Sequence, residues 1–135
     1  MKIKCYYRTY NIYSDNLEAY ADIIDIQNYN INYAKYLFNF IKDIKTLETI
    51  EYISINIEKI EFKEIEEFSF NVDIPDIYVY IYIEKTLFEH NLGWNDDWEC
   101  PTIVVKKALE GWKKFLEMPR EKDTVYKFEI PDSDL

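Results

Sequence analysis

The chain has 135 residues, of which 48% are hydrophobic, and its 26 acidic and 16 basic residues give a formal net charge of −10. This composition excludes an intrinsically disordered chain, because it supplies enough apolar surface to offset the entropy lost on folding. The negative charge argues against direct binding to nucleic acid or to anionic membranes and favours a basic protein partner, although an acidic surface also serves solubility alone.

The organisation of the chain predicts a single domain over residues 1–135. It contains two Gly and four Pro, and no linker-like or repeated segment interrupts it. The opening residues lack the apolar stretch of a signal peptide, and the longest apolar run, 77–83, is far shorter than the roughly 20 residues of a membrane helix. We therefore expect a soluble cytoplasmic protein whose Cys5 and Cys100 stay reduced.

The first third of the chain predicts a strand and then two helices. Apolar residues alternate over 2–10, which is typical of a strand, and Ser14 offers N-cap chemistry for a helix over 16–27. A second helix begins at Asn32 and runs to Ile44, and it is so apolar that we expect it to be buried. Carboxylates spaced by three and four residues predict an acidic stripe on the first helix, formed by Asp15, Glu18, Asp22 and Asp25.

The middle of the chain predicts three strands. Apolar residues alternate over 52–57, 68–74 and 77–83, and a charged turn over 58–67 separates the first two. The last of these segments has no polar break on either face, which favours a central strand.

The last third predicts a loop, a helix and a final strand. Residues 86–99 contain a Gly and several Asn and Asp, which are typical of a loop. Pro101 is well placed in the first turn of a helix that ends near Glu117, and alternation over 125–130 predicts the last strand.

The predicted fold is therefore α+β in the order β-α-α-β-β-β-α-β, with helices on one face of a mostly antiparallel sheet of about four or five strands. Without the strand at 68–74, the order reduces to the ferredoxin-like βαββαβ arrangement. Alternation gathers tyrosines and basic residues on the other face of the sheet, namely Tyr6, Arg8, Tyr52, Tyr78, Tyr80, Tyr82 and Lys127.

That tyrosine-rich face has three interpretations. Aromatic residues on such a sheet stack RNA bases in some proteins, but few basic residues are present here to neutralise phosphates. An open face suits a protein contact, including self-association as a homodimer, with Tyr78, Tyr80 and Tyr82 as the candidate residues. A covering helix or turn would instead make the tyrosines ordinary packing.

The segment before the last helix interleaves two tryptophans with three carboxylates. Aromatic anchors flanked by acids suit a basic, concave partner such as a nuclease active site. Alternatively, the tryptophans pin the loop to the core and the carboxylates complement the helix dipole. The candidate partner-binding residues of this segment are Trp94, Asp96, Asp97, Trp98 and Glu99. The acidic stripe is the next candidate, with a solvated helix face as its alternative.

Catalytic and metal-binding motifs are absent from the sequence. His90 is the one histidine and has no nucleophile motif beside it, and the chain contains no CxxC, HExxH, GxGxxG, P-loop or calcium-loop pattern. We therefore predict no catalytic residue, cofactor or metal, with a carboxylate-pair hydrolase as the remaining enzymatic alternative.

In size, acidity, α+β order and lack of catalytic motifs, the chain resembles the immunity proteins that bacteria encode beside polymorphic or contact-dependent toxins. The closest local likeness is an aromatic-Pro entry into a helix that ends in W-x-x-F-L, from Trp98-Glu99-Cys100-Pro101 to Trp112-Lys113-Lys114-Phe115-Leu116. The resemblance implies binding to a cognate toxin domain, a basic nuclease, and occlusion of its active site. The alternatives are a phage-encoded acidic inhibitor of a nucleic-acid-binding defence complex and a small enzyme or ligand-binding domain.

Overall fold

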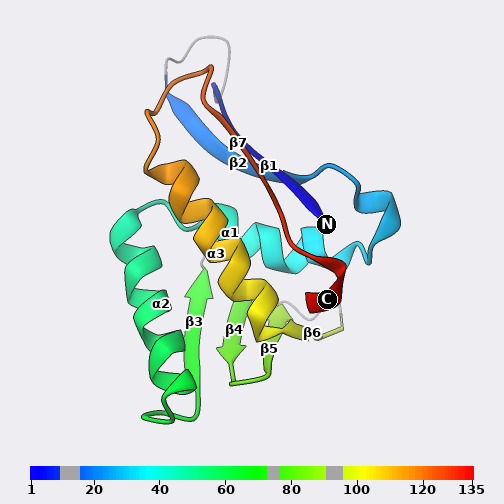
Figure 1. Ribbon diagram of the computed structural model, residues 1–135, viewed down its shortest axis with the longest axis vertical. Coiled ribbons are helices and arrows are strands. Elements are labelled where there is room, and N and C mark those ends of the chain that lie inside the picture. The colour runs from blue at the N-terminus through cyan, green and yellow to red at the C-terminus, as the bar shows by residue number, and fades with distance from the viewer. Residues whose placement is uncertain (10–15, 73–76, 91–95) are drawn as a thin grey trace.

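The computed structural model describes residues 1–9, 16–72, 77–90 and 96–135 (Figure 1). A three-stranded antiparallel sheet has the order β2-β1-β7, with β1 at Lys2–Thr9, β2 at Leu17–Ile23 and β7 at Val125–Glu129. A four-stranded antiparallel sheet has the order β3-β4-β5-β6, with β3 at Phe68–Val72, β4 at Ile77–Ile81, β5 at Lys85–His90 and β6 at Trp98–Pro101.

Helices connect and cover the two sheets. The π-helix η2 continues directly into the short helix α1, and two longer helices follow later in the chain. Their bounds are η2 Tyr33–Phe38, α1 Asn39–Lys42, α2 Leu47–Glu61 and α3 Thr102–Leu116, with short 3₁₀ turns at Ile26–Asn28 (η1) and Asp132–Asp134 (η3). The predicted α+β class with mostly antiparallel strands is confirmed, but the order of the elements differs in three places.

The helix predicted over 16–27 is wrong, because this segment forms strand β2 and pairs with β1. Ala19, Ala21 and Ile23 are buried and alternate with side chains that face outward. The segment's apolar residues fit both a period of 3.6 and a period of two, and pairing with the preceding strand decides between them.

The strand predicted at 52–57 is also wrong, because it lies within helix α2. The buried residues are Ile50, Ile53, Ile57 and Ile60, a helical spacing, whereas Ile55 is 51% exposed. Thr46 caps this helix, since its Oγ1 accepts a hydrogen bond from the Thr49 amide at 3.2 Å.

The charged segment that follows is part helix and part turn. Helix α2 extends to Glu61, and Lys63 then adopts a left-handed φ of 59°. The Glu64 amide donates a hydrogen bond to the Lys59 carbonyl at 2.8 Å, and the Lys63 amide donates one to the Ile60 carbonyl at 3.0 Å. These two hydrogen bonds form a Schellman motif. The turn predicted at 58–67 therefore begins at the end of α2.

The loop predicted over 86–99 contains most of β5 and the start of β6, with residues 91–95 outside the described part of the chain. Buried Thr86 and Phe88 alternate with outward side chains in β5. The expected strands at 68–74 and 77–83 correspond to β3 and β4, although β4 ends at Ile81 and residues 73–74 lie outside the described part of the chain. Strand β4 does lie centrally, between β3 and β5. The last helix and strand are confirmed as α3 and β7.

Helix α3 lies at the centre of the molecule and contacts both sheets, α1 and α2 (Figure 1). The Trp112 indole is fully buried and donates a hydrogen bond from Nε1 to the Ile44 carbonyl at 2.8 Å. The Phe115 ring packs on Tyr7 of β1, with 4.6 Å between the ring centroids. Gly111 admits the ring of Phe128 on β7, because a Cβ at this position would lie 2.5 Å from that ring.

A buried pair of threonines fixes the start of α3 on the four-stranded sheet. The Thr102 hydroxyl donates to the Tyr82 carbonyl at 2.7 Å and lies 2.9 Å from the Thr86 hydroxyl. Thr102 has a single hydroxyl hydrogen, so Thr86 must be the donor between the two hydroxyls. The Thr102 amide donates to the Glu84 carbonyl at 3.0 Å, which also ties α3 to the turn between β4 and β5.

Replacing Thr102 with Val should lower the free energy of unfolding by about 1–3 kcal/mol, because the Thr86 hydroxyl and the Tyr82 carbonyl lose their partner. Thr102→Ser keeps the hydroxyl, and loss of one methyl should cost about 0.8 kcal/mol. Urea unfolding of the three proteins measures both differences. Equal stability of Thr102→Val and the unmodified chain would contradict the hydrogen-bond network.

Candidate partner-binding surface

The face of the four-stranded sheet that points away from the core is rich in tyrosine. Because Val79, Phe88 and Cys100 point into the core, their strand neighbours point outward. Strand pairing places these outward residues in adjacent rows. This surface, called the tyrosine face below, comprises Ser69, Asn71, Tyr78, Tyr80, Tyr82, Leu87, Glu89 and Glu99.

The tyrosine face is open to solvent. Tyr78 is 37% exposed, and Tyr80, Tyr82 and Leu87 are half-buried. At one end, Tyr82, Lys85, Glu99 and their neighbours line a hollow of about 540 Å³. This part of the sheet therefore offers rigid aromatic surface with a recess beside it.

The electrostatics of the tyrosine face are negative. Burial raises the pKa of Tyr80, and the nearby carboxylates of Glu89 and Glu67 raise it further. Lys85 lies at the same face and forms an ion pair with Glu99 at 3.4 Å. Glu67 and Glu89 therefore add negative charge beside the tyrosine rings.

The acidic segment before α3 divides between the surface and the core. Asp96 and Asp97 are exposed, and the Asp96 carbonyl accepts a hydrogen bond from the Tyr36 hydroxyl at 2.7 Å. The Trp98 ring turns inward and stacks on Tyr36, with centroids 6.0 Å apart and an interplanar angle of 16°. Within the described part of the chain, the Trp98 ring also contacts the rings of Tyr33 and Phe88, with centroids 4.8 Å and 5.6 Å away.

Trp98 therefore anchors its segment to the core, as the alternative interpretation of the sequence expected. Glu99 points the other way and joins the tyrosine face. Asp96 and Asp97 lead into β6 at the end of the sheet where Glu89 pairs with Tyr78. Trp94 lies outside the described residues.

The predicted acidic stripe is not a helical stripe, because its described members lie on or beside strand β2. Glu18 and Asp22 pair across the sheet with Arg8 and Lys4 of β1. Asp25 follows the strand and accepts a hydrogen bond from the Lys2 amide at 3.0 Å. Asp15 lies outside the described residues. Basic residues thus alternate with these carboxylates across the hairpin, and no continuous acidic surface results.

A pair of stacked tyrosines orders the same surface. The rings of Tyr6 and Tyr20 lie 5.7 Å apart at an angle of 17°. The Tyr6 hydroxyl donates to Asp22 at 2.6 Å, and the Tyr20 hydroxyl donates to Glu18 at 3.1 Å. Each of these two carboxylates therefore accepts a hydrogen bond within the sheet.

The residues predicted to share one sheet face are divided among three elements. Tyr6, Arg8 and Lys127 lie on the three-stranded sheet, and Tyr52 lies on α2. Tyr78 and Tyr80 lie in the four-stranded sheet, and Tyr82 directly follows β4. The division separates Arg8 and Lys127 from the last three tyrosines, and the charged residues beside Tyr80 are Glu67 and Glu89.

Two residues of the tyrosine face were missed in the sequence because they fall in the predicted loop. Leu87 and Glu89 alternate with the buried residues Thr86 and Phe88, and this alternation was the available signal. The neighbouring Asn and Asp residues obscured it.

Among the described residues, no group of three or more His, Cys, Asp or Glu side chains is arranged to hold a metal ion. No helix in the described part of the chain has the length and apolar character needed to cross a bilayer.

Both cysteine thiols are buried, and burial raises the pKa of each to about 12. Since the thiolate is the reactive species, Cys5 and Cys100 should react slowly with Ellman's reagent in the native protein near neutral pH. Both should react readily in urea, which serves as the control. Rapid reaction of either native thiol would contradict this burial.

Replacing Glu89 with Gln should lower the pKa of Tyr80 toward its ordinary value, because the neutral side chain no longer opposes the phenolate. Glu99→Gln is the matched control. Glu99 lies on the same face but is not one of the carboxylates that raise the pKa of Tyr80, so this variant should leave that pKa unchanged. NMR titration of the Tyr80 ring measures both effects. An unchanged pKa in Glu89→Gln would place that carboxylate away from Tyr80.

Comparisons with protein family models, with curated proteins and with solved structures found no match to this chain.

Proposed function

We propose that this chain binds and neutralises a basic protein, in the manner of a bacterial toxin immunity protein, and that the tyrosine face is its docking surface. The observation that carries the proposal is the open row of Tyr78, Tyr80 and Tyr82 with carboxylates beside it. The resemblance in size, acidity and motif content suggests the class of partner, a toxin domain that acts on nucleic acid.

The aromatic residues suit a protein interface. Tyrosine offers a large, rigid contact area with a hydrogen-bonding tip, and it is enriched among residues that dominate binding energy. Tyr78 and Tyr80 project from β4, which has a neighbouring strand on each side. Their backbone is therefore held in place before binding, which reduces the entropy lost in the complex.

The charges favour a basic partner. A nuclease holds phosphates with Arg and Lys side chains, and Glu67 and Glu89 would meet such groups beside the tyrosines. Asp96 and Asp97 extend the negative charge along the approach to β6. Electrostatic steering of this kind raises association rates to on the order of 10⁸ M⁻¹s⁻¹ at low salt.

The proposal is tested by co-expressing the chain with the toxin domain encoded beside its gene and scoring survival of the host. The double variant Tyr80→Ala with Glu89→Lys should bind the purified toxin about 30-fold more weakly or worse, which corresponds to the loss of a dominant contact of about 2 kcal/mol. Lys substitutions at Asp96 and Asp97 should slow association and reduce its dependence on salt.

The matched control is Glu18→Lys, which reverses a charge on the outer face of the other sheet. This variant should protect the host as the unmodified chain does. The melting temperature of each variant separates loss of binding from loss of fold. Full protection by the Tyr80 and Glu89 double variant, or loss of protection with Glu18→Lys alone, would overturn the assignment of the surface.

A further inference from the structure

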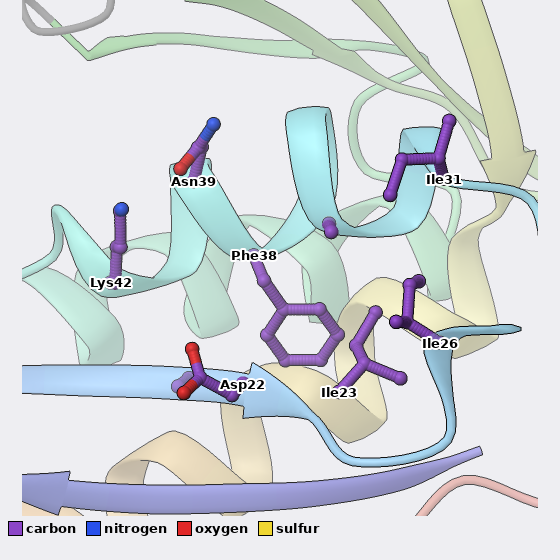
Figure 2. Close-up of a pocket in the computed structure, with 9 residues that line it drawn as sticks. Asp22, Ile23, Ile26, Ile31, Phe38, Asn39 and Lys42 are labelled. Atoms are coloured by element: carbon purple, nitrogen blue, oxygen red, sulfur yellow. The ribbon is translucent and has the colours of Figure 1, made fainter.

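A groove lies between the edge strand β2 and the helical segment η2–α1, on the three-stranded sheet and away from the tyrosine face (Figure 2). Its volume is about 430 Å³, within the range of roughly 300–1,000 Å³ typical of ligand sites. Figure 2 shows apolar side chains gathered at one end and polar ones at the other. The apolar end has Ile23, Ile26, Ile31 and Phe38, and the polar end has Asp22, Asn39 and Lys42.

One wall of the groove is a free sheet edge. Strand β2 pairs only with β1 among the described strands, and the Ile24 amide donates to the Lys2 carbonyl at 2.9 Å. Hydrogen bonds alternate along an antiparallel pair, so the even-numbered residues of β2 bond to β1. The N–H and C=O groups of Ala19, Ala21 and Ile23 therefore point to the free edge, and they have no partner in the described part of the chain.

The opposite wall has unusual backbone geometry. Segment η2 is a π-helix of six residues, a rare conformation that often occurs at functional sites. It contributes Ala34 and Phe38 to the groove, and α1 contributes Asn39 and Lys42. The Asn39 amide donates to the Lys35 carbonyl at 2.7 Å, which orients this side chain on the wall.

Of the two charged side chains at the polar end of the groove, only one has a hydrogen-bond or ion-pair partner in the described part of the chain. The Asp22 carboxylate on the strand side already accepts the Tyr6 hydroxyl at 2.6 Å. The Lys42 ammonium on the helix side forms no ion pair with any residue that the structure describes. An acidic group of a ligand would therefore complement Lys42.

We propose that this groove binds an extended peptide, which adds as a strand to the free edge of β2. Strand addition provides main-chain hydrogen bonds along an edge and selects side chains through neighbouring pockets. The peptide's inward side chains would be apolar at the isoleucine end and acidic at Lys42, while its outward side chain beside Asp22 would be basic or polar. The site is independent of the proposed function, which uses the other sheet.

The probe is a phage-displayed library of random dodecapeptides selected on the full chain. Selected peptides should alternate apolar with polar residues and carry an acidic residue, and binding to a chosen peptide should protect the Ala21 amide from hydrogen exchange. Failure to enrich any peptide would overturn the proposal. So would selected peptides that protect only amides outside β2.

Matched variants locate the binding. Ile31 and Ile24 are both 51% exposed, but only Ile31 lines the groove. Ile31→Asp should weaken peptide binding about tenfold, or about 1.4 kcal/mol, while Ile24→Asp should not. Equal loss in both would overturn the proposal.

Charge variants test the acidic preference. Lys42→Glu should shift selection from acidic to basic peptides, whereas Lys45→Glu, a lysine outside the groove lining, should leave it unchanged. An unchanged preference in Lys42→Glu would exclude this lysine as the recognition group.

Tyr80→Ala should leave peptide binding intact, which separates failure of this proposal from failure of the tyrosine face as a toxin-binding surface.

Discussion

Packing of one face of helix α3 against both sheets is the constraint on which the rest of the structure depends. The buried residues of the helix form one broad apolar face, while Ile103, Glu110 and Lys114 are exposed on the opposite side. Trp112 reaches toward α1, Phe115 packs on β1, and Gly111 admits Phe128 of β7. Thr102 holds the other end to the turn after β4. Each sheet covers part of the helix, and neither alone would bury it.

This arrangement leaves each sheet with one outward face, and the two faces differ in chemistry. On the three-stranded sheet, Lys4 and Arg8 stand opposite Asp22 and Glu18, so residues of both charges share this surface. On the four-stranded sheet, Glu89 lies beside tyrosines. A surface of mixed charge has little net attraction for a charged partner, whereas a surface with an excess of carboxylates attracts a basic one.

The predictions from sequence succeeded where a segment's pattern was compatible with one structure. The isoleucines and tyrosines of β4 alternate without a polar break, and α3 has a proline at its start and apolar residues at helical spacing. They failed at β2 and α2, where short apolar patterns fit both periods. The candidate site was partly foreseen: its tyrosines were named, but Leu87 and Glu89 were assigned to a loop.

The sequence by itself determined the α+β class, the acidity, the helix at α3 and the tyrosines of β4, because each depends on composition or on local periodicity. Tertiary structure decided that 17–23 is a strand, that the strands divide into two sheets, and that the Trp98 ring belongs to the core. It also decided which charges meet, since Arg8 and Glu18 become neighbours only through strand pairing. Contacts between distant residues depend on register and packing, and no local pattern encodes these for a single chain.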